Sequence, residues 1–195
     1  MDRETQIKPY VKLRDGAHIP FRPIAPSDAP ALQRFHLGLS DYSVYLRHIH
    51  ALPRLSDTQA RHFTEVDQVQ RFAIIAFDPD APTEIIAVVR YEGSVGSNRA
   101  EYAALVTDKW QGRGLGTALT LELIRAAQRH GITCLYALVL PENVRMLRLL
   151  RNLGLPERVK YEDGAAEIEI DLTGSVDPQL EHPRHDVQEP SPAGD

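Results

Sequence analysis

The stretch Val106-Thr-Asp-Lys-Trp-Gln-Gly-Arg-Gly-Leu-Gly-Thr117 is a glycine-rich turn between an apolar run and an amphipathic segment. Gly112, Gly114 and Gly116 lack side chains, so the backbone here can approach a ligand closely. Successive N–H groups that enter a helix form a concave anion site, which the helix dipole favours. The alternative is a tight turn that needs glycine for its dihedral angles alone. Because Arg113 and Thr117 flank the glycines, we predict an anion-binding turn.

Two common nucleotide-binding motifs do not fit this turn. A P-loop requires Gly-Lys-Ser/Thr, and no such sequence follows the glycines. A dinucleotide fold uses the spacing G-x-G-x-x-G, whereas the spacing here is G-x-G-x-G. Glu142 does follow the next predicted strand, but about 50 residues remain after it. They are too few for a second nucleotide-binding half.

The hydrophobic pattern on either side of the turn predicts an α+β fold. Extended runs before the turn, separated by turn residues, predict a hairpin and an antiparallel meander. Strand 101–106, helix 115–130 and strand 134–140 follow one another, which implies a right-handed parallel crossover. We therefore expect a mixed, mostly antiparallel sheet with one parallel βαβ crossover, flanked by helices. The other expected elements are strands 10–13, 18–24, 71–78 and 84–91, helices 27–39 (N-cap Ser27), 42–50 and 142–153, a short helix capped by Ser56, and a hairpin over 158–172.

The composition is that of a soluble, globular chain, with 43% apolar and 25% charged residues in 195. The single cysteine, Cys134, excludes an internal disulfide framework and is predicted to be a core residue. The N-terminus carries no apolar signal segment, and no apolar run approaches the ~18 residues of a membrane span. We expect a cytoplasmic protein without membrane association and without a metal site.

The net charge of −5 argues against nucleic-acid binding, and it is unevenly distributed. Residues 173–195 contribute −4, with four of the 14 prolines and no aromatic residue. We predict a disordered acidic, Pro-rich tail there, after a single domain over 1–172. Segment 109–160 holds nine basic residues against three acidic ones, which leaves −7 on the rest of the domain. The arginines could simply solvate helix faces; the alternative is a polyanionic ligand on the basic side and a cationic substrate on the acidic side.

The turn resembles that of a known superfamily. Gln111-Gly-Arg-Gly-Leu-Gly116 matches the Q/R-x-x-G-x-G/A element of the GNAT N-acetyltransferases, and Pro141-Glu-Asn143 is similar to their next motif. Softer matches resemble the bacterial Pat-type protein lysine acetyltransferase domain. These are Lys12-Leu-Arg-Asp-Gly16, Phe21-Arg-Pro-Ile24, Ala100-Glu-Tyr-Ala103 and Met146-Leu-Arg148. The resemblance covers residues 10–172 and implies the GNAT fold.

The resemblance also implies that acetyl-CoA is the cosubstrate. Its pyrophosphate would lie on the amides of the glycine turn, and its pantetheine arm would pair with the backbone of Leu105 and Val106. Asn143 matches the family position that hydrogen-bonds this arm, and helix capping is its alternative role. The implied cofactor-binding residues are Leu105, Val106, Gln111, Gly112, Arg113, Gly114, Gly116, Thr117 and Asn143.

Acetyl transfer requires a neutral acceptor amine, and a lysine with a pKa of ~10.4 is neutral about once in 2,500 molecules at pH 7. A positioned base therefore has a clear task. Glu101 matches the glutamate that acts as base in Pat-type enzymes, and burial would raise its pKa toward the useful range. The alternative is a carboxylate that faces solvent at a strand end. Leu150 stands where many superfamily members have a tyrosine, so the group that protonates the leaving thiolate is not identified.

The resemblance thus implies an N-acetyltransferase that moves acetyl from acetyl-CoA to a primary amine by direct attack. The expected acceptor is a protein lysine, such as one on an acyl-CoA synthetase. Two alternatives stay open: a small-molecule amine N-acetyltransferase, and a non-catalytic acetyl-CoA-binding regulatory module.

Overall fold

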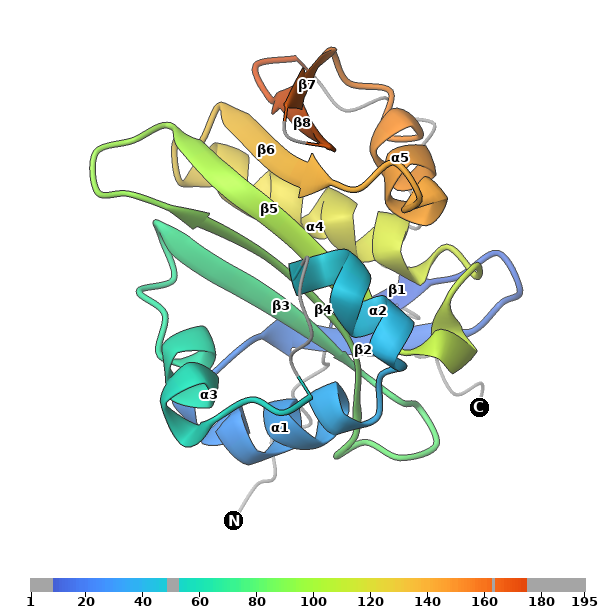
Figure 1. The fold of residues 1–195 in the computed structure, drawn as a ribbon. Helices are drawn as coiled ribbons and strands as arrows, with labels where there is room; N and C mark the ends of the chain where they lie inside the picture. The colour runs from blue at the N-terminus through green and yellow to red at the C-terminus, as the bar shows by residue number, and fades with distance from the viewer. Residues whose placement is uncertain (1–8, 49–52, 163, 175–195) are drawn as a thin grey trace, which may run out of the picture.

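A computed structural model describes residues 9–48, 53–162 and 164–174. Within these residues, eight strands form one mixed sheet in the order β1-β2-β3-β4-β5-β6-β8-β7 (Figure 1). The strands are β1 (Tyr10–Lys12), β2 (His18–Pro23), β3 (Arg71–Phe77), β4 (Ile85–Gly93), β5 (Arg99–Val106), β6 (Cys134–Val139), β7 (Glu157–Glu162) and β8 (Ala165–Asp171). The helices are α1 (Ala29–Leu37), α2 (Asp41–His48), α3 (Asp57–Thr64), α4 (Leu115–Arg129) and α5 (Val144–Arg151).

The sheet has the predicted topology. β1 and β2 form a hairpin, and β2 to β5 run antiparallel, each to the next. β5 and β6 pair in parallel across α4, and β6, β8 and β7 are again antiparallel. The prediction of a mostly antiparallel sheet with one parallel crossover is confirmed.

Helices cover both faces of the sheet: α1, α2 and α3 lie on one side, and α4 and α5 on the other (Figure 1). Successive strand residues therefore enter two different cores. Val88 of β4 packs with α1 and α3, whereas Val89 packs with α4. Because side chains alternate between two covered faces, β3 and β4 are continuous apolar runs in sequence.

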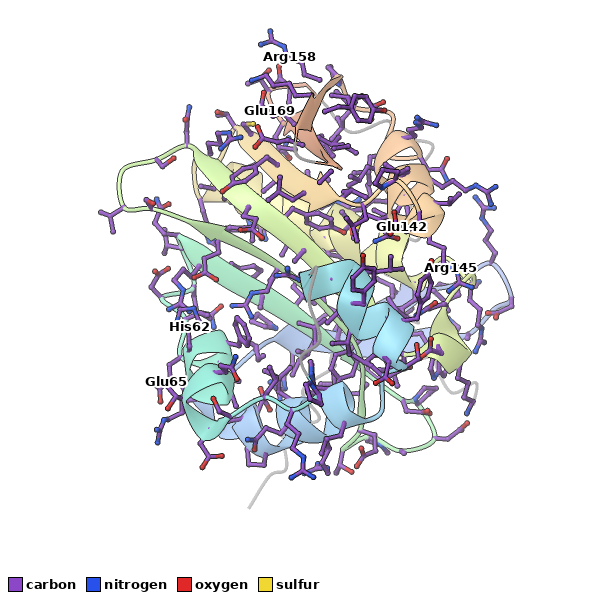
Figure 2. The ribbon with its side chains drawn as sticks, in the orientation of Figure 1. His62, Glu65, Glu142, Arg145, Arg158 and Glu169 are labelled. Atoms are coloured by element: carbon purple, nitrogen blue, oxygen red, sulfur yellow. The ribbon has the colours of Figure 1, made fainter. Side chains whose placement is uncertain are left out.

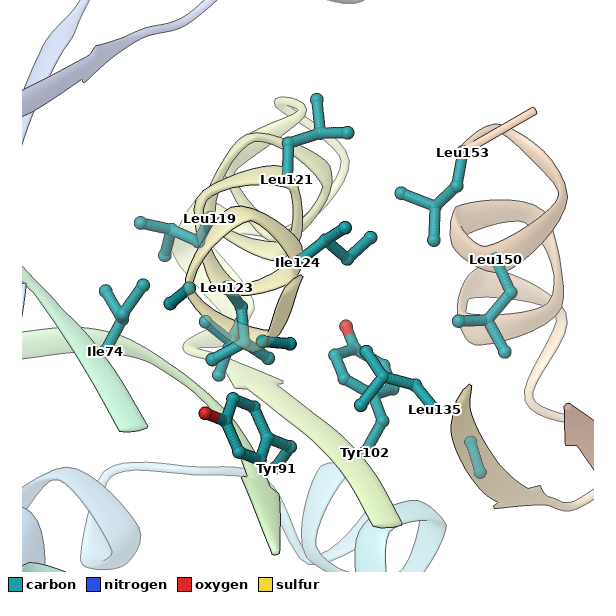
Figure 3. Packing of buried hydrophobic residues seen from close by; sticks show 14 of the residues in the cluster. Ile74, Tyr91, Tyr102, Leu119, Leu121, Leu123, Ile124, Leu135, Leu150 and Leu153 are labelled. Carbon is teal, nitrogen blue, oxygen red and sulfur yellow. The ribbon is translucent and has the colours of Figure 1, made fainter. Parts of the chain in front are cut away.

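The larger core fixes α4 against the centre of the sheet. Leu119, Leu123 and Ile124 are fully buried beside Tyr91 of β4 and Tyr102 of β5 (Figure 3). Burying one such leucine contributes roughly 1.5–3 kcal/mol. The start of α4 is consequently held in place where β5 ends.

Two predicted helix starts are wrong by a few residues. Pro26–Asp28 forms a 3-10 turn, so α1 begins at Ala29 and Ser27 is not its N-cap. The Asp28 carboxylate accepts a bidentate hydrogen bond from Arg22 (2.7 Å each) and one from the Ala25 N–H (2.8 Å). α5 begins at Val144 rather than Glu142, because Asn143 is its N-cap. The capping box of Ser56 and Gln59 on α3 is confirmed.

Two predictions lie wholly or partly outside the described residues. The tail predicted from Thr173 is described only at Thr173 and Gly174. The helix predicted over 42–50 is described as far as His48.

Candidate active site

The glycine turn joins β5 to α4. Gly112 and Gly114 have φ angles of +75° and +88°, which L side chains rarely adopt. A Cβ atom at either position would meet nothing within 4 Å, so the space above the turn is open. The first N–H of α4 with a backbone acceptor is that of Ala118, which donates to Gly114 O (3.0 Å). The preceding N–H groups are available to an anion at the positive end of the helix dipole.

Gly116 has a different role from the two glycines before it. A Cβ atom there would come within 3.0 Å of Leu149 Cδ1 on α5. The close approach at this position is thus made by a neighbouring helix. The glycine pattern combines two positions with left-handed backbone conformation and one at which a side chain of α5 packs closely against α4.

The Gln111 side chain links the glycine turn to the end of β5 by a hydrogen bond. Its Nε2 donates to Val106 O (2.8 Å) and to Ser43 Oγ (3.2 Å). Its Oε1 accepts a hydrogen bond from Arg145 of α5, which lies beside the turn (Figure 2). Arg145 was not singled out from the sequence, where its signal is a cation two residues after Asn143. It adds positive charge beside the turn.

Asp108 connects the same turn to the segment that precedes α2. Its carboxylate accepts hydrogen bonds from Ser40 N (3.1 Å), Ser40 Oγ (3.0 Å) and Ser43 Oγ (3.0 Å). Burial would raise the pKa of Asp108, but these hydrogen bonds outweigh it and hold the pKa below its ordinary value. The sequence contained no pattern that pairs positions 40 and 108.

A buried hydrogen-bond chain joins β5 to the first turn of α4. Tyr102 Oη lies 2.7 Å from Thr120 Oγ1, which donates in turn to Gly116 O (2.7 Å). The Tyr102 hydroxyl is therefore the donor to Thr120. Desolvation raises the pKa of Tyr102, so this proton stays in place at neutral pH.

β5 and β6 pair over only three residues of each strand, from Arg99–Cys134 to Glu101–Tyr136. β6 continues beside β8 as far as Val139. Among the strands described, none pairs with β5 on this side beyond Glu101. The unpaired edge includes Leu105 and Val106, where an extended ligand could add as a strand.

Like Gln111, the predicted ligand residues Asn143 and Arg113 make side-chain contacts within the protein. Asn143 Oδ1 accepts a hydrogen bond from Met146 N (3.1 Å), which is the capping role considered as the alternative. Arg113 forms an ion pair with Asp15 (2.7 Å) and stacks on Trp110, with its Cζ 4.0 Å from the ring centroid. The pKa of Asp15 is lowered, most strongly by the hydrogen bond from Ala17 N and next by the hydrogen bond from Arg113. Thr117 lies in the first turn of α4.

Glu101 lies on β5 directly opposite Glu92 of β4. Its side chain is 42% exposed and faces Arg47 of α2, with 3.9 Å between Oε1 and Nη1. The burial predicted for this carboxylate is wrong, because its side of β5 opens into a hollow instead of packing against a helix. We call this space the Glu101 hollow; it is lined by Arg47, Phe63, Arg90, Glu92, Glu101 and Ala103.

An apolar hollow adjoins the Glu101 hollow and shares four of its lining residues. It is bounded by Leu32 and Phe35 of α1 and extends along β5 to Ala104 and Leu105. The two hollows, together called the recess here, line the face of β5 from Glu101 to Leu105. Leu105 follows Glu101 by four positions along the strand, so their Cα atoms are about 13 Å apart.

Arg90 is a buried cation in the wall of both hollows. The residue is 7% exposed, and its Cζ lies 4.5 Å from the centroid of the Phe63 ring. Nε and Nη2 have no hydrogen-bond partner among the described residues. Desolvation lowers the pKa of Arg90 to about 10, against the opposing effect of Glu92, so it is charged at neutral pH. The sequence signal that could have identified it is an arginine within the apolar run 84–91.

The recess is less acidic than the charge distribution in sequence suggested. Arg47 and Arg90 balance Glu92 and Glu101 in the lining of the Glu101 hollow. Glu92 is further contacted by Arg71 (3.1 Å) and by His62 (3.3 Å), the latter on α3 (Figure 2). Most of the charge of −7 on the domain outside segment 109–160 comes from acidic residues that do not line the recess.

Metal-binding clusters and membrane-spanning helices are both absent from the described residues. These residues contain no group of three or more His, Cys, Asp or Glu side chains arranged to hold a metal ion. None of their helices combines the length and apolar character needed to cross a membrane.

Known proteins share this fold. The model of the acetyltransferase (GNAT) domain family matches residues 18–156. The crystal structure of the GNAT domain of S. lividans PAT is 35% identical, with a TM-score of 0.78, over 84% of this chain and 96% of that one. Acetyltransferase PA5475 of Pseudomonas aeruginosa is 27% identical over 73% of this chain and 77% of its own length.

Acetyltransferase Pat of Mycolicibacterium smegmatis is 28% identical over 83% of this chain. The alignment spans 48% of that relative, so the chain corresponds to about half of it. The GNAT fold and the resemblance to the Pat-type domain are confirmed by these matches. The chain belongs to the acetyltransferase (GNAT) domain family of acetyl-CoA-dependent N-acetyltransferases.

Proposed function

We propose that this domain transfers acetyl from acetyl-CoA to a protein lysine, with Glu101 as the general base. The observation that carries the proposal is the recess along β5, whose two adjoining hollows are lined by Glu101 and by Leu105. The similarity to Pat proteins supports a protein acceptor. We also propose that the domain spans residues 1–172, with an acidic, Pro-rich tail over 173–195.

In this proposal the glycine turn holds the cosubstrate. Amides from 111 to 117 bind the pyrophosphate, and Leu105 and Val106 pair with the pantetheine arm beside the capping residue Asn143. Arg145 adds positive charge beside Gln111. Arg113, held by Asp15, contributes to the field that attracts the phosphates.

The chemistry needs two proton losses from the nitrogen and one displacement. Glu101 accepts the first proton from the acceptor ammonium, directly or through one water. The neutral nitrogen attacks the thioester carbonyl carbon and the C–N bond forms; the nitrogen then gives its second proton to water, and the C–S bond breaks as the CoA thiolate leaves. The thiol has a pKa of ~8.5, close to that of cysteine, so the thiolate can take its proton from water.

A small-molecule amine is the second candidate acceptor. It is favoured by one specific observation, the buried Arg90 beneath helices that cover the recess. A lysine side chain brings no group that pairs with a guanidinium, whereas a small polar molecule can.

Acetyl transfer is tested with the whole chain. Calorimetry should show acetyl-CoA binding at micromolar concentration, and mass spectrometry should find acetyl-lysine on an acyl-CoA synthetase incubated with enzyme and acetyl-CoA. A parallel panel of free amines distinguishes the two acceptors. Binding without transfer to any acceptor would favour a regulatory module, and absence of binding would overturn the proposal.

A further inference from the structure

The guanidinium of Arg90 is a buried group in the wall of the recess. The unpartnered atoms are Nε and Nη2, which lie on the same edge of the planar group. Such an edge matches the two oxygens of one carboxylate. The nearest acid, Glu92, lies 3.7 Å from Nη2, which is too far for a hydrogen bond.

The protein carboxylates in the recess do not satisfy its cations. Glu92 Oε1 already contacts Arg71 Nε (3.1 Å) and His62 Nε2 (3.3 Å). Arg47 has one ion pair, with Glu101 at 3.9 Å, and no hydrogen bond among the described residues. The recess therefore holds two guanidinium groups with donors to spare beside a single open carboxylate, Glu101.

We propose that Arg90, assisted by Arg47, binds a carboxylate of the amine acceptor. The substrate class is then a small aminocarboxylate, whose carboxylate pairs with Arg90 while its amine lies beside Glu101. This rests on the proposed acetyl transfer with Glu101 as the base. It identifies the second candidate acceptor by its chemistry.

The first experiment uses the unaltered protein at saturating acetyl-CoA. kcat/KM is measured for 4-aminobutanoate, 5-aminopentanoate and 6-aminohexanoate, and for propylamine, butylamine and pentylamine, which lack only the carboxylate. We expect an advantage of about 10- to 100-fold for the carboxylate of best length, as for a charge-assisted hydrogen bond. Equal values within each pair would overturn the proposal. A preference for succinyl-CoA over acetyl-CoA, without any advantage for the aminocarboxylates, would assign the carboxylate to the donor and overturn it too.

Substitutions test whether Arg90 and Arg47 cause the preference for aminocarboxylates. Arg90→Gln and the more exposed Arg47→Gln should each lower the ratio of kcat/KM between aminocarboxylate and alkylamine by about 10-fold or more. Arg34→Gln is the matched control, because Arg34 is exposed on α1, pairs with Glu84 and lies outside the lining. Thermal unfolding checks that each variant folds. An unchanged ratio in both hollow variants would contradict the assignment.

Binding without turnover separates this inference from the proposed function. Calorimetry compares 6-acetamidohexanoate with N-pentylacetamide, neither of which can react as an acceptor amine. Binding of the carboxylate alone, lost in Arg90→Gln, supports the site even if no amine is acetylated, in which case only the proposed function fails. Acetylation of all amines with equal efficiency and no binding of 6-acetamidohexanoate leaves the function intact and overturns the site.

Discussion

Arg47 of α2 and Glu101 of β5 face each other across the Glu101 hollow, with 3.9 Å between Nη1 and Oε1. The pair is long and partly exposed to solvent, so it contributes at most about 1 kcal/mol to folding. Replacing the carboxylate thus tests catalysis with little disturbance of the fold.

We expect Glu101→Gln to lower kcat by about 10²- to 10⁴-fold at neutral pH, the range for loss of a general base. Binding of acetyl-CoA, measured by calorimetry, should be unchanged, because the glycine turn is untouched. Glu84→Gln is the control, since Glu84 is an exposed carboxylate outside the hollow. Full turnover by Glu101→Gln would show that the base lies elsewhere.

Gly114→Ala and Gly116→Ala should behave differently. Alanine at 114 must adopt a φ near +88°, which costs about 1–2 kcal/mol of unfolding free energy. Alanine at 116 meets the end of the Leu149 side chain, which can move, lies at ordinary contact distance from Val106 Cγ2 (3.7 Å), and gains helix propensity, so its effect should lie within about 0.5 kcal/mol. Urea denaturation measures both values. Similar losses in the two variants would mean that the turn has a different conformation.

Tyr102→Phe should destabilise the fold by about 1 kcal/mol, because the Thr120 hydroxyl loses its donor inside the core. It should also weaken acetyl-CoA binding, since Thr120 holds Gly116 at the start of α4. Thermal unfolding and calorimetry measure the two effects. Tyr161→Phe, at a 78% exposed position, is the matched control and should change neither.

Asp28 supplies a pH-dependent contribution to stability. Burial opposes ionisation, but Arg22 and the Ala25 N–H outweigh it and lower the pKa of Asp28 below 3.8. The stabilisation is thus present above pH 3.8 and disappears as the pH falls through the lower pKa of the folded state. Asp28→Asn should cost about 2 kcal/mol at pH 7, and the difference from the unaltered protein should shrink below pH 3.8.

Urea denaturation at a series of pH values measures this dependence. Asp80→Asn, at an exposed turn position, serves as the control. A difference that stayed constant down to pH 2 would exclude an ionic role for Asp28.

Local sequence patterns were sufficient to predict the order of elements. Periodicity defined α4, whose predicted inner face of Leu115, Leu119, Leu123 and Ala126 is buried. Turn residues separated the strands of the meander, and the strand–helix–strand succession predicted the parallel pair. These features depend on neighbours in the chain, which a single sequence contains.

Contacts between distant positions could not be predicted in the same way. Nothing in the sequence pairs Ser40 with Asp108, or brings Arg47 and Arg90 into one lining with Glu101. The exposure of Glu101 was misjudged for the same reason, because its neighbours in sequence are apolar while its neighbours in space are charged. The charge of −7 was summed over all residues of the domain outside segment 109–160. It therefore combined Arg47 and Arg90 of the hollow with acidic residues that lie far from it.

The two left-handed glycines have a consequence for classifying relatives of this chain. Gly112 and Gly114 are required by the path of the backbone into α4, whether or not a reaction takes place. A descendant that lost Glu101, the proposed base, would therefore be expected to retain the glycine signature. Under the proposals made above, the side chains at positions 90 and 101 would then distinguish, among such sequences, an enzyme and its acceptor class from a domain that only binds a nucleotide-like ligand.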